Sequence, residues 1–491
     1  MSMEAGLPAD ISANPQRLRR PDSIRPQTGI VHLGLGAFYR AHGAIYIEQA
    51  MEKSGGDWGI IGVSLMRPDQ RDALAPQDFA YTAVELGPNG ETPHVIGVIN
   101  DVLVARENQR AVIDAMSDPA VKIVSLTVTE KGYCHEPSTG KLNRNHPDIQ
   151  HDLAYPEAPV SALGFLVRAL EKRHAAGLRP FTVLCCDNLP ENGKVVRGVV
   201  LELAGLISSD LQGWIASEGA FPSTMVDRIV PATKPEDIDR LAQITGVLDL
   251  SPVMHEPFRQ WVVEDHFVDG ERPDLGAVGV ELVKDVTPFE HMKLRCLNGT
   301  HSSLAYLGYL AGHETIAQTV ADPVFARFCK MLWDTEITPG LKAPPGISLG
   351  DYTAALFDRY ANPAIRHRTW QIAMDGSQKL PQRILGTLTE NLAANRPITG
   401  LALAVAAWMR YVGGIDEKGD AIDVRDPLAT RLKSLSDGAA EPAEKVAALL
   451  SVREIFPAPL ADNPTFRNAL TTAYQSLVTK GARQTIEDLS R

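Results

Sequence analysis

The first 284 residues alternate short apolar runs with amphipathic stretches, a pattern that predicts an α/β domain. The apolar runs, rich in β-branched residues, lie at 30–38, 58–65, 121–129, 181–188 and 224–231. Stretches with apolar residues at helical spacing lie between them, at 39–55, 158–174 and 193–206. Two further short strands, at 79–86 and 93–105, are expected to form an antiparallel insertion.

After Thr287 the strand-like runs nearly vanish and helical patterns dominate. They cover residues 288–311, 314–334, 350–360, 363–375, 398–412, 441–452 and 464–488. We therefore expect an α/β domain at 29–284, followed by a mainly α-helical domain at 285–491. Residues 1–28 are polar and proline-containing, and they are expected to form an N-terminal arm.

The charge balance and the longest apolar stretch exclude some partners. Lys and Arg total 48 and Asp and Glu total 60, which gives a net charge of −12. This balance argues against non-specific nucleic-acid binding and against an anionic membrane surface. The longest apolar stretch, 398–409, is too short to span a membrane and predicts a buried helix. With no basic-then-apolar leader, we expect a cytoplasmic protein whose partner is a small molecule.

The cysteines indicate neither a disulfide scaffold nor a metal centre. There are five, with no CxxC pair, and the sequence predicts no metal site. Cys185 and Cys186 lie in an apolar run and are expected to be buried free thiols.

The first apolar run ends in Gly34-x-Gly36, where a strand is expected to turn into a helix. The first glycine permits the tight turn, and the second lets backbone N–H groups approach a pyrophosphate. The third glycine of the GxGxxG pattern is absent, because Tyr39 stands there. In its strand–helix–strand setting, the turn favours a Rossmann-type dinucleotide site.

The end of the second strand leaves the cofactor's ribose contact open. Its sequence, SLMR at 64–67, lacks the acidic residue usual in NAD sites. We expect NAD as the cofactor, and Arg67 leaves NADP possible. The candidate cofactor-binding residues are Gly34, Leu35, Gly36, Ala37, Phe38, Arg67 and Thr129.

The helical domain opens with a helix-start signal followed by polar residues on one side. Thr287 at the N-cap, proline at N1 and Glu290 at N3 match a capping box. On an ideal helix, Glu290 lies about 60° from Lys293, His301 about 80° and Asn298 about 140°, all in the same sense. The alternative interpretation is a surface helix with scattered polar residues.

A lysine with amide and imidazole neighbours suits hydride-transfer chemistry. Reducing a ketone needs a proton donor for the developing alkoxide, and oxidising an alcohol needs a base. Burial and a nearby cationic cofactor ring lower a lysine pKa toward neutrality. An asparagine amide can donate a hydrogen bond to the oxyanion. The sequence thus predicts an oxidoreductase with Lys293 at its centre.

Three further polar residues have a functional and a structural interpretation. Asn188 ends an apolar run, at the sheet edge where α/β sites lie, and it also suits a helix N-cap. Asp227 lies in an apolar strand, either as a ligand-binding group or paired with a cation such as Arg228. Lys379 follows an expected helix end or turn at 375–381 and is either a ligand contact or an exposed lysine.

Six segments, in this order, resemble the long-chain mannitol dehydrogenase family. They are IVHLGLGAFYRAH (30–42), TVTEKGY (127–133), CDNLPENG (186–193), MVDRIVP (225–231), FEHMKLRCLNGTHSSLAYLGY (289–309) and DGSQKLPQR (375–383). The resemblance runs from about residue 28 to the C-terminus. The segments EPFRQWVVEDHF (256–267) and RHRTWQIAMDGSQKLPQR (366–383) resemble most its fructuronate-reducing branch.

The resemblance implies a zinc-independent enzyme that uses NAD(H), or sometimes NADP(H), with a Rossmann-type domain and a helical domain. It implies Lys293 as the general acid/base, with Asn188 and Asn298 holding the substrate oxygen as it becomes an alkoxide. It also implies that His301 binds the neighbouring hydroxyl, and that Glu290 tunes Lys293 or relays its protons.

For the rest of the substrate, the resemblance implies that Asp227 and Lys379 bind further hydroxyls. The chain departs from the mannitol-oxidising branch at Gln371, where that branch has arginine, and at Lys131, where it has glycine. We expect Lys131 to pair with the carboxylate of a sugar acid; the equal alternative is a solvent-facing lysine.

The expected reaction is the interconversion of D-fructuronate and D-mannonate. The alternatives are a polyol 2-dehydrogenase acting on mannitol or arabinitol, and a tagaturonate reductase. A protein that binds a dinucleotide without turnover is the alternative of another class. Members of the family are often monomeric, so a monomer or a weak homo-oligomer is expected.

Overall fold

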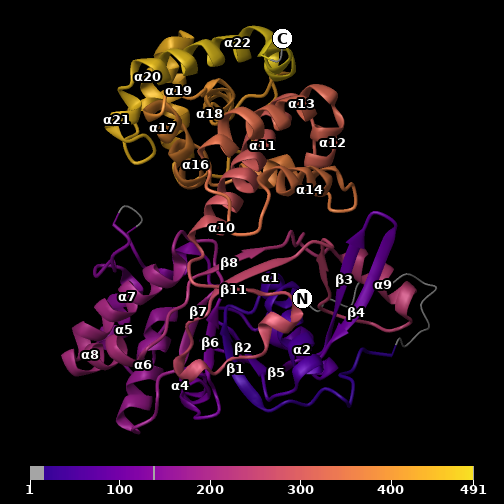
Figure 1. The fold of residues 1–491 in the computed structure, drawn as a ribbon, viewed down its shortest axis with the longest axis vertical. Coiled ribbons are helices and arrows are strands. Elements are labelled where there is room, and N and C mark those ends of the chain that lie inside the picture. The colour runs from indigo at the N-terminus through magenta and orange to yellow at the C-terminus, as the bar shows by residue number, and fades with distance from the viewer. Residues whose placement is uncertain (1–15, 137–138, 490–491) are drawn as a thin grey trace. The chain divides into compact units, whose positions relative to one another are not determined.

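The computed structural model describes residues 16–136 and 139–489 of the chain. The chain divides into two compact units, Met1–Thr287 and Pro288–Arg491 (Figure 1). Within the described residues, the β-strands all belong to the first unit, and the second unit is built from helices.

A five-stranded parallel sheet forms the centre of the first unit. Its strands are β1 (Thr28–Leu33), β2 (Gly59–Ser64), β5 (Ile99–Val104), β6 (Ile123–Leu126) and β7 (Thr182–Cys185). Their spatial order is β5-β2-β1-β6-β7, and every neighbouring pair is parallel. Counted along the chain within this sheet, the order is 3-2-1-4-5, as in a Rossmann fold. The predicted α/β Rossmann-type class is confirmed, and the strand order reverses between β1 and β6.

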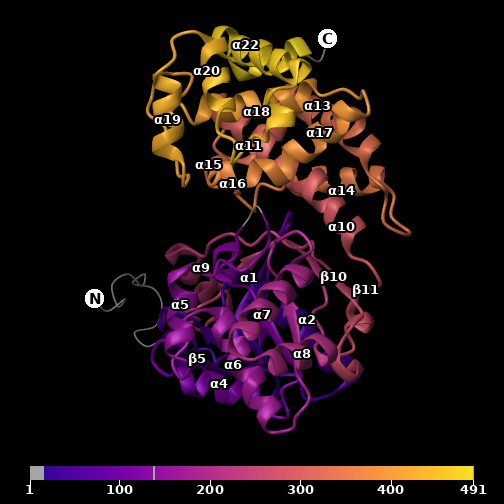
Figure 2. The ribbon, with the colours of Figure 1, turned by 90° about the vertical axis from the view of Figure 1, so that its left-hand side faces the viewer.

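Helices cover both faces of this sheet (Figures 1 and 2). The helices of the first unit are α1 (Ala37–Ala41), α2 (Gly43–Ser54), α3 (Asp69–Leu74), α4 (Gln109–Ser117), α5 (Pro147–Ala154), α6 (Ala162–Ala175), α7 (Asn192–Ile207), α8 (Ser209–Glu218) and α9 (Pro235–Thr245). Neighbouring residues of β1 point to opposite faces. Ile30 packs in one core with Ile45 of α2, whereas Val31 packs in another with Leu166 of α6.

Two three-stranded sheets complete the first unit. One, in the order β4-β3-β9, contains β3 (Tyr81–Gly87), β4 (Gly90–Ile96) and β9 (Val253–His255). The other, in the order β11-β10-β8, contains β8 (Thr224–Asp227), β10 (Gln260–Glu264) and β11 (Glu281–Val283).

These sheets correct two strand predictions. The segment 93–105 is not one strand: β4 pairs antiparallel with β3, whereas β5 joins the parallel sheet beside β2. The run at 224–231 ends as a strand at Asp227 and pairs antiparallel with β10, outside the parallel sheet. Periodicity identifies an apolar strand but not its partner, which tertiary packing decides.

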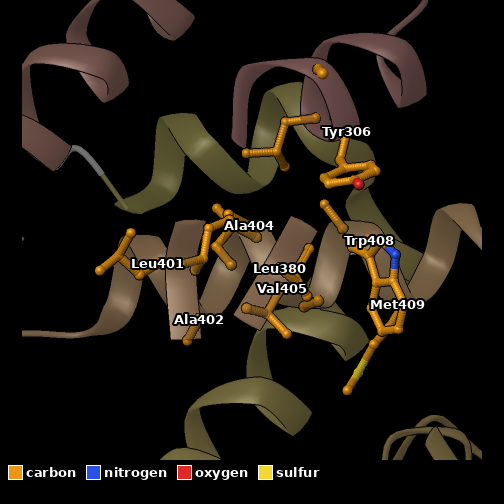
Figure 3. Packing of buried hydrophobic residues seen from close by; sticks show 14 of the residues in the cluster. Tyr306, Leu380, Leu401, Ala402, Ala404, Val405, Trp408 and Met409 are labelled. Atoms are coloured by element: carbon orange, nitrogen blue, oxygen red, sulfur yellow. The ribbon is translucent and has the colours of Figure 1, made fainter. Parts of the chain in front are cut away.

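The helices of the second unit pack around one hydrophobic core. They are α10 (Thr287–Met292), α11 (Thr300–Leu310), α12 (Ile316–Ala321), α13 (Pro323–Met331), α14 (Leu349–Ala361), α15 (Thr369–Ala373), α16 (Gly376–Leu380), α17 (Gly386–Ala393), α18 (Thr399–Tyr411), α19 (Ala429–Asp437), α20 (Pro442–Leu450), α21 (Ala458–Ala461) and α22 (Pro464–Leu489). The side chains of α18 fill the core, with Val405 and Trp408 fully buried (Figure 3). The predicted buried helix is confirmed. In the part of the chain that the structure describes, no helix has the length and apolarity needed to cross a membrane.

Three π-helical segments interrupt these helices. They are η5 (Lys293–Gly299), η6 (Leu332–Ile337) and η8 (Pro381–Leu385). η5 joins α10 to α11, so the backbone is helical from Thr287 to Leu310. Such wide turns are rare and occur frequently at functional sites.

The structure corrects the predicted helix end or turn at 375–381, because a helix begins there. α16 starts at Gly376, and helical backbone continues through Pro381 to Ala393. Asp426 caps the start: it accepts hydrogen bonds from the N–H and the O–H of Ser377, at 2.7 and 2.6 Å. The cap comes from a distant part of the chain, so local sequence did not reveal it.

Part of the predicted N-terminal arm, residues 1–15, lies outside the described residues. The part that follows packs against the first unit: the N–H of Leu18 donates to the carbonyl of Leu248 at 2.9 Å. The side chain of Leu18 is buried.

Candidate active site

The glycine turn lies between β1 and α1, beside the end of β6. Gly34 has φ +89°, and a Cβ there would lie 2.2 Å from the carbonyl oxygen of Thr127, so only glycine fits. Gly36 has φ −109°, and a Cβ there would meet nothing closer than 3.8 Å. Packing within the protein therefore does not require glycine at 36, whereas close approach of a pyrophosphate does. The turn fits a dinucleotide at the point where the strand order reverses.

A buried histidine ties this turn to β6. Nδ1 of His32 lies 2.9 Å from Ser125 Oγ, and Nε2 lies 2.8 Å from Thr127 Oγ1. The hydroxyl of Thr127 donates to the carbonyl of Gly34 at 2.9 Å. Burial lowers the pKa of His32 to about 3, so the ring is neutral at pH 7. The ring stacks on Tyr39 at 3.4 Å, which explains how a tyrosine fits where the third glycine of the motif is absent.

Asp187, two residues after β7, holds the loop that follows β6. Its carboxylate accepts the N–H groups of Val128 and Thr129, at 2.8 and 3.0 Å, and the hydroxyl of Tyr133, at 2.5 Å. Thr129 has φ +66°, which is strained for a β-branched residue. Asp187 therefore stabilises a backbone shape that Thr129 alone disfavours, in the loop predicted to contact the cofactor.

Asp187→Asn is expected to raise the KM for NADH about tenfold and to lower the melting temperature by several degrees. The amide replaces one acceptor oxygen with a donor, which leaves a buried N–H or O–H unsatisfied, at a cost of about 1–3 kcal/mol. Thermal unfolding and initial rates at varied NADH check this, with Asp210→Asn, at an exposed position, as the control. Wild-type values for Asp187→Asn would contradict the positioning role.

The other candidates of the first unit differ in exposure. Asn188, Lys131 and Arg67 are exposed, and they follow β7, β6 and β2 by three, five and three residues respectively. Asp227, the last residue of β8, is only 3% exposed. A carboxylate buried to this extent needs strong hydrogen-bond or charge partners.

The alternative that Asn188 caps a helix is wrong. α7 begins at Asn192, with Glu191 as its N-cap residue. The side chain of Asn192 instead donates to the carbonyls of Asp187 and Thr224, at 3.0 and 2.9 Å. Asn192 thus joins the loop that carries Asn188 to the strand that ends in Asp227.

In the second unit, the segment with Lys293, Asn298 and His301 is not the ideal α-helix of the sequence prediction. Lys293 begins η5, Asn298 lies near its end, and His301 follows in α11. In a π-helix each N–H bonds five residues back, so a turn contains about 4.4 residues instead of the 3.6 of an α-helix. Around the helix axis, Asn298 therefore lies at a smaller angle from Lys293 than the roughly 140° expected for an α-helix. All three side chains are buried, with exposed fractions of 8%, 7% and 6%.

Side chains from neighbouring helices support the wide turn. The indole Nε1 of Trp333 donates to the carbonyl of Cys296 at 2.9 Å, and the hydroxyl of Tyr360 donates to the carbonyl of Leu297 at 2.8 Å. Arg295 makes two bonds of 2.6 Å to the carboxylate of Glu390 on α17. These contacts satisfy carbonyls of the widened backbone and fix the orientation of η5.

The buried side chains of Asn298 and His301 each retain a polar atom without a hydrogen-bond partner. These atoms are Nδ2 of Asn298 and Nε2 of His301. A buried polar atom without a partner costs free energy, so a ligand that satisfies both atoms gains affinity. Burial, followed by the charges of His367 and Arg383, lowers the pKa of His301 well below its usual value. His301 is therefore neutral at pH 7.

The remaining second-unit candidates lie on three different helices. Lys379 on α16 is partly buried and donates to the carbonyl of Met374 at 2.6 Å, so it is not the exposed turn lysine of the structural alternative. Gln371 lies exposed on α15, and Glu290 lies partly buried on α10. α10 begins at Thr287, one residue earlier than the predicted capping box places it.

One group of three possible metal ligands occurs among the described residues: Cys134, His146 and Asp148. However, Nδ1 of His146 already accepts the N–H of Asp148 at 3.2 Å. All five cysteines are buried free thiols, as predicted for Cys185 and Cys186.

Sequence reasoning missed several residues that support the site. His32 and Asp187 hold the two loops predicted to contact the cofactor, and His367 and Arg383 lie near His301. The signal for His32 was a histidine within an apolar strand. For Arg383 no local signal exists, because its relation to His301 depends on the packing of η8 against η5.

Comparison with known proteins gives consistent matches over both units. The family model described as "Mannitol dehydrogenase Rossmann domain" matches residues 28–276, and the model described as "Mannitol dehydrogenase C-terminal domain" matches residues 285–478. Together they cover most of the chain.

Two relatives from Escherichia coli are equally similar. The chain is 47% identical to its D-mannonate oxidoreductase, over 95% of this chain and 97% of the relative. It is also 47% identical to the uncharacterized oxidoreductase YeiQ, over 95% and 96%. Among solved structures, Pseudomonas fluorescens mannitol 2-dehydrogenase in ternary complex with NAD and D-mannitol has a TM-score of 0.88 and 40% identity, with 97% of each chain covered.

Proposed function

Because the chain belongs to the mannitol dehydrogenase family, we propose that it is an NAD-dependent oxidoreductase that interconverts D-fructuronate and D-mannonate. The observation that carries the chemistry is the buried Lys293 on a π-helical turn with Asn298 and His301. Two observations support this choice of substrate: the similarity to D-mannonate oxidoreductase over almost the whole chain, and the segments at 256–267 and 366–383. Equal identity to YeiQ means that identity alone does not select the substrate.

Lys293 is the proposed general acid/base. In reduction its ammonium group gives a proton to the ketone oxygen as that oxygen gains negative charge, and in oxidation its amine takes the proton of the hydroxyl. Glu290, three residues earlier on the same helical backbone, is proposed to tune Lys293 or to relay its protons. A buried lysine is easier to deprotonate than an exposed one, which suits both directions of the reaction.

Asn298 and His301 are proposed to bind the reacting end of the substrate. Nδ2 of Asn298 is a donor without a protein partner, and it suits the oxygen that becomes an alkoxide. Neutral His301 can donate or accept through Nε2, and it suits the adjacent hydroxyl. Asn188, Asp227 and Lys379 are proposed to hold the remaining oxygen atoms.

The glycine turn is the proposed cofactor site. NAD supplies or accepts the hydride when it is bound. The turn at Gly34 and Gly36 suits its pyrophosphate, and the strained loop at Thr129 is a further contact. Leu35, Ala37 and Phe38 belong to the same turn and are proposed to contact the cofactor. Because of Arg67, the test below includes NADPH.

Initial rates with a panel of sugars test the proposal. D-fructuronate, D-tagaturonate and D-fructose are supplied with NADH or NADPH, and D-mannonate, D-mannitol and D-arabinitol with the oxidised cofactors, while absorbance follows the cofactor. We expect kcat/KM for D-fructuronate with NADH to exceed that of every other ketose at least tenfold. Preference for D-fructose or D-mannitol would make the chain a polyol 2-dehydrogenase, and no turnover with any pair would make it a binding protein.

A further inference from the structure

Four basic side chains of the second unit act electrostatically on His301. They are Arg359 on α14, His367 just before α15, Lys379 on α16 and Arg383 on η8, and they are called the basic cluster below. After burial, each of these four side chains lowers the pKa of His301. Only Lys379 has a role in the function proposed above.

Arg383 is held close to the catalytic helix by both its backbone and its side chain. A Cβ on Gly299 would lie 2.6 Å from the carbonyl oxygen of Arg383, so η5 and η8 are packed backbone to backbone. Nη1 of Arg383 donates to Ser302 Oγ at 3.1 Å, and Ser302 is the residue after His301. A guanidinium anchored in this way has a fixed direction, which reduces the entropy lost when it binds a ligand.

His367 connects the cluster to His301. The imidazole rings of His367 and His301 meet edge to face, with centroids 4.7 Å apart. The ring of Tyr360 stacks on His301, with centroids 5.3 Å apart. Nδ1 of His367 is buried without a hydrogen-bond partner, like Nε2 of His301. Burial, followed by the charges of Lys379 and Arg383, lowers the pKa of His367 to about 4, so its ring is neutral at pH 7.

The positive charges of Lys379 and Arg383 attract an anion placed near them. D-fructuronate carries one anionic group, a carboxylate separated from its ketone by three hydroxyl-bearing carbons. The planar fork of a guanidinium matches a carboxylate and makes two parallel hydrogen bonds. Neutral ketoses such as D-fructose have a hydroxymethyl group there and gain nothing from these charges.

We infer that Arg383, with His367 beside it, binds the carboxylate of the substrate and makes the enzyme select sugar acids over neutral ketoses. This inference rests on the function proposed above. It assigns the carboxylate to the second unit, whereas Lys131 of the first unit is the candidate from sequence.

The test compares D-fructuronate with D-fructose in Arg383→Gln, Arg383→Lys, His367→Asn and Lys131→Ala. Arg368→Gln is the matched control, because it removes the same charge as Arg383→Gln. Arg368 is exposed and directly follows His367. We expect Arg383→Gln to lower kcat/KM for D-fructuronate about 10²–10³-fold, with kcat/KM for D-fructose changed less than threefold. Arg383→Lys is expected to recover part of the loss and His367→Asn to lose about tenfold, while Arg368→Gln behaves as the wild type.

Equal losses on both ketoses in Arg383→Gln would overturn the inference, and so would wild-type selectivity in that variant. A selective loss in Lys131→Ala alone would also overturn it, in favour of Lys131. D-fructose reduction reports on folding, because a misfolded variant loses both activities.

A binding measurement separates failure of this inference from failure of the proposed function. Thermal unfolding with NADH present is followed with D-mannonate and with D-mannitol. If the wild type reduces no hexuronate but D-mannonate still stabilises it, and Arg383→Gln abolishes that shift, the proposed reaction is wrong and the carboxylate site stands. If D-mannonate stabilises the wild type and Arg383→Gln equally, the carboxylate site is wrong whatever the reaction.

Discussion

Lys293→Ala is expected to lower kcat for D-fructuronate reduction by about 10²–10⁴-fold, the range that general acid catalysis contributes. Lys293 begins the π-helical segment η5 and its side chain is 8% exposed, so few water molecules can donate a proton in its place. Because the cofactor turn belongs to the first unit, the Kd for NADH should stay within about twofold of the wild type. Rapid-mixing rates and NADH fluorescence titration measure the two quantities.

Lys342→Ala serves as the control for Lys293→Ala, since Lys342 is an exposed lysine of the same unit. It should retain wild-type kcat and melting temperature. Retained turnover in Lys293→Ala, or a loss explained by lost NADH binding, would contradict the role of Lys293. A loss at saturating NADH with an unchanged melting temperature supports it.

Gly34→Ala is expected to lower stability, whereas Gly36→Ala is expected to weaken NADH binding. At Gly34 the added Cβ meets the carbonyl of Thr127 at 2.2 Å and φ is +89°, so the first unit should lose about 2–4 kcal/mol of stability. At Gly36 the Cβ meets nothing within 3.8 Å, so the fold should be unchanged. There we expect the Kd for NADH to rise at least tenfold, because the methyl group occupies the space that a pyrophosphate needs.

Thermal unfolding together with NADH titration distinguishes these two effects. Gly34→Ala should lower the melting temperature by several degrees, and Gly36→Ala should leave it unchanged while weakening NADH. Unaltered NADH affinity in Gly36→Ala would mean that the cofactor does not approach this turn.

The core of the cofactor unit could be predicted from sequence because its signals are local. The run ending at Gly34, the helix at 39–55 and the strand at 58–65 correspond to β1, to α1 with α2 and to β2. The pairing of β5 could not be predicted, because one apolar run at 93–105 serves two sheets. Which sheet a strand joins depends on contacts distant in sequence.

The residues proposed for catalysis could be selected from sequence, but their geometry could not be predicted. An α-helical repeat puts Asn298 about 140° from Lys293. The wide turn that changes this depends on Trp333 and Tyr360, which bond carbonyls of η5 from other helices. Likewise, Asp426 caps α16 from a distance of about fifty residues, so the segment at 375–381 resembled a helix end.

The side chains near His301 also could not be predicted from sequence. His367 and Arg383 lie within a segment that resembles the fructuronate-reducing branch, yet their sequence positions give no reason to place them beside His301. The packing of η8 on η5 brings Arg383 there. The role proposed for Arg383 rests on charges and contacts that exist only in the folded chain.

The most direct test of the central claim is the fate of the transferred hydride. The chain is incubated with D-fructuronate and NADH that carries deuterium at the transferable position, and the product is analysed by mass spectrometry and NMR. We predict D-mannonate with one deuterium on the carbon that was the ketone, and no such product from Lys293→Ala over the same time. Unlabelled product, a different epimer, or no reduction of D-fructuronate would contradict the account.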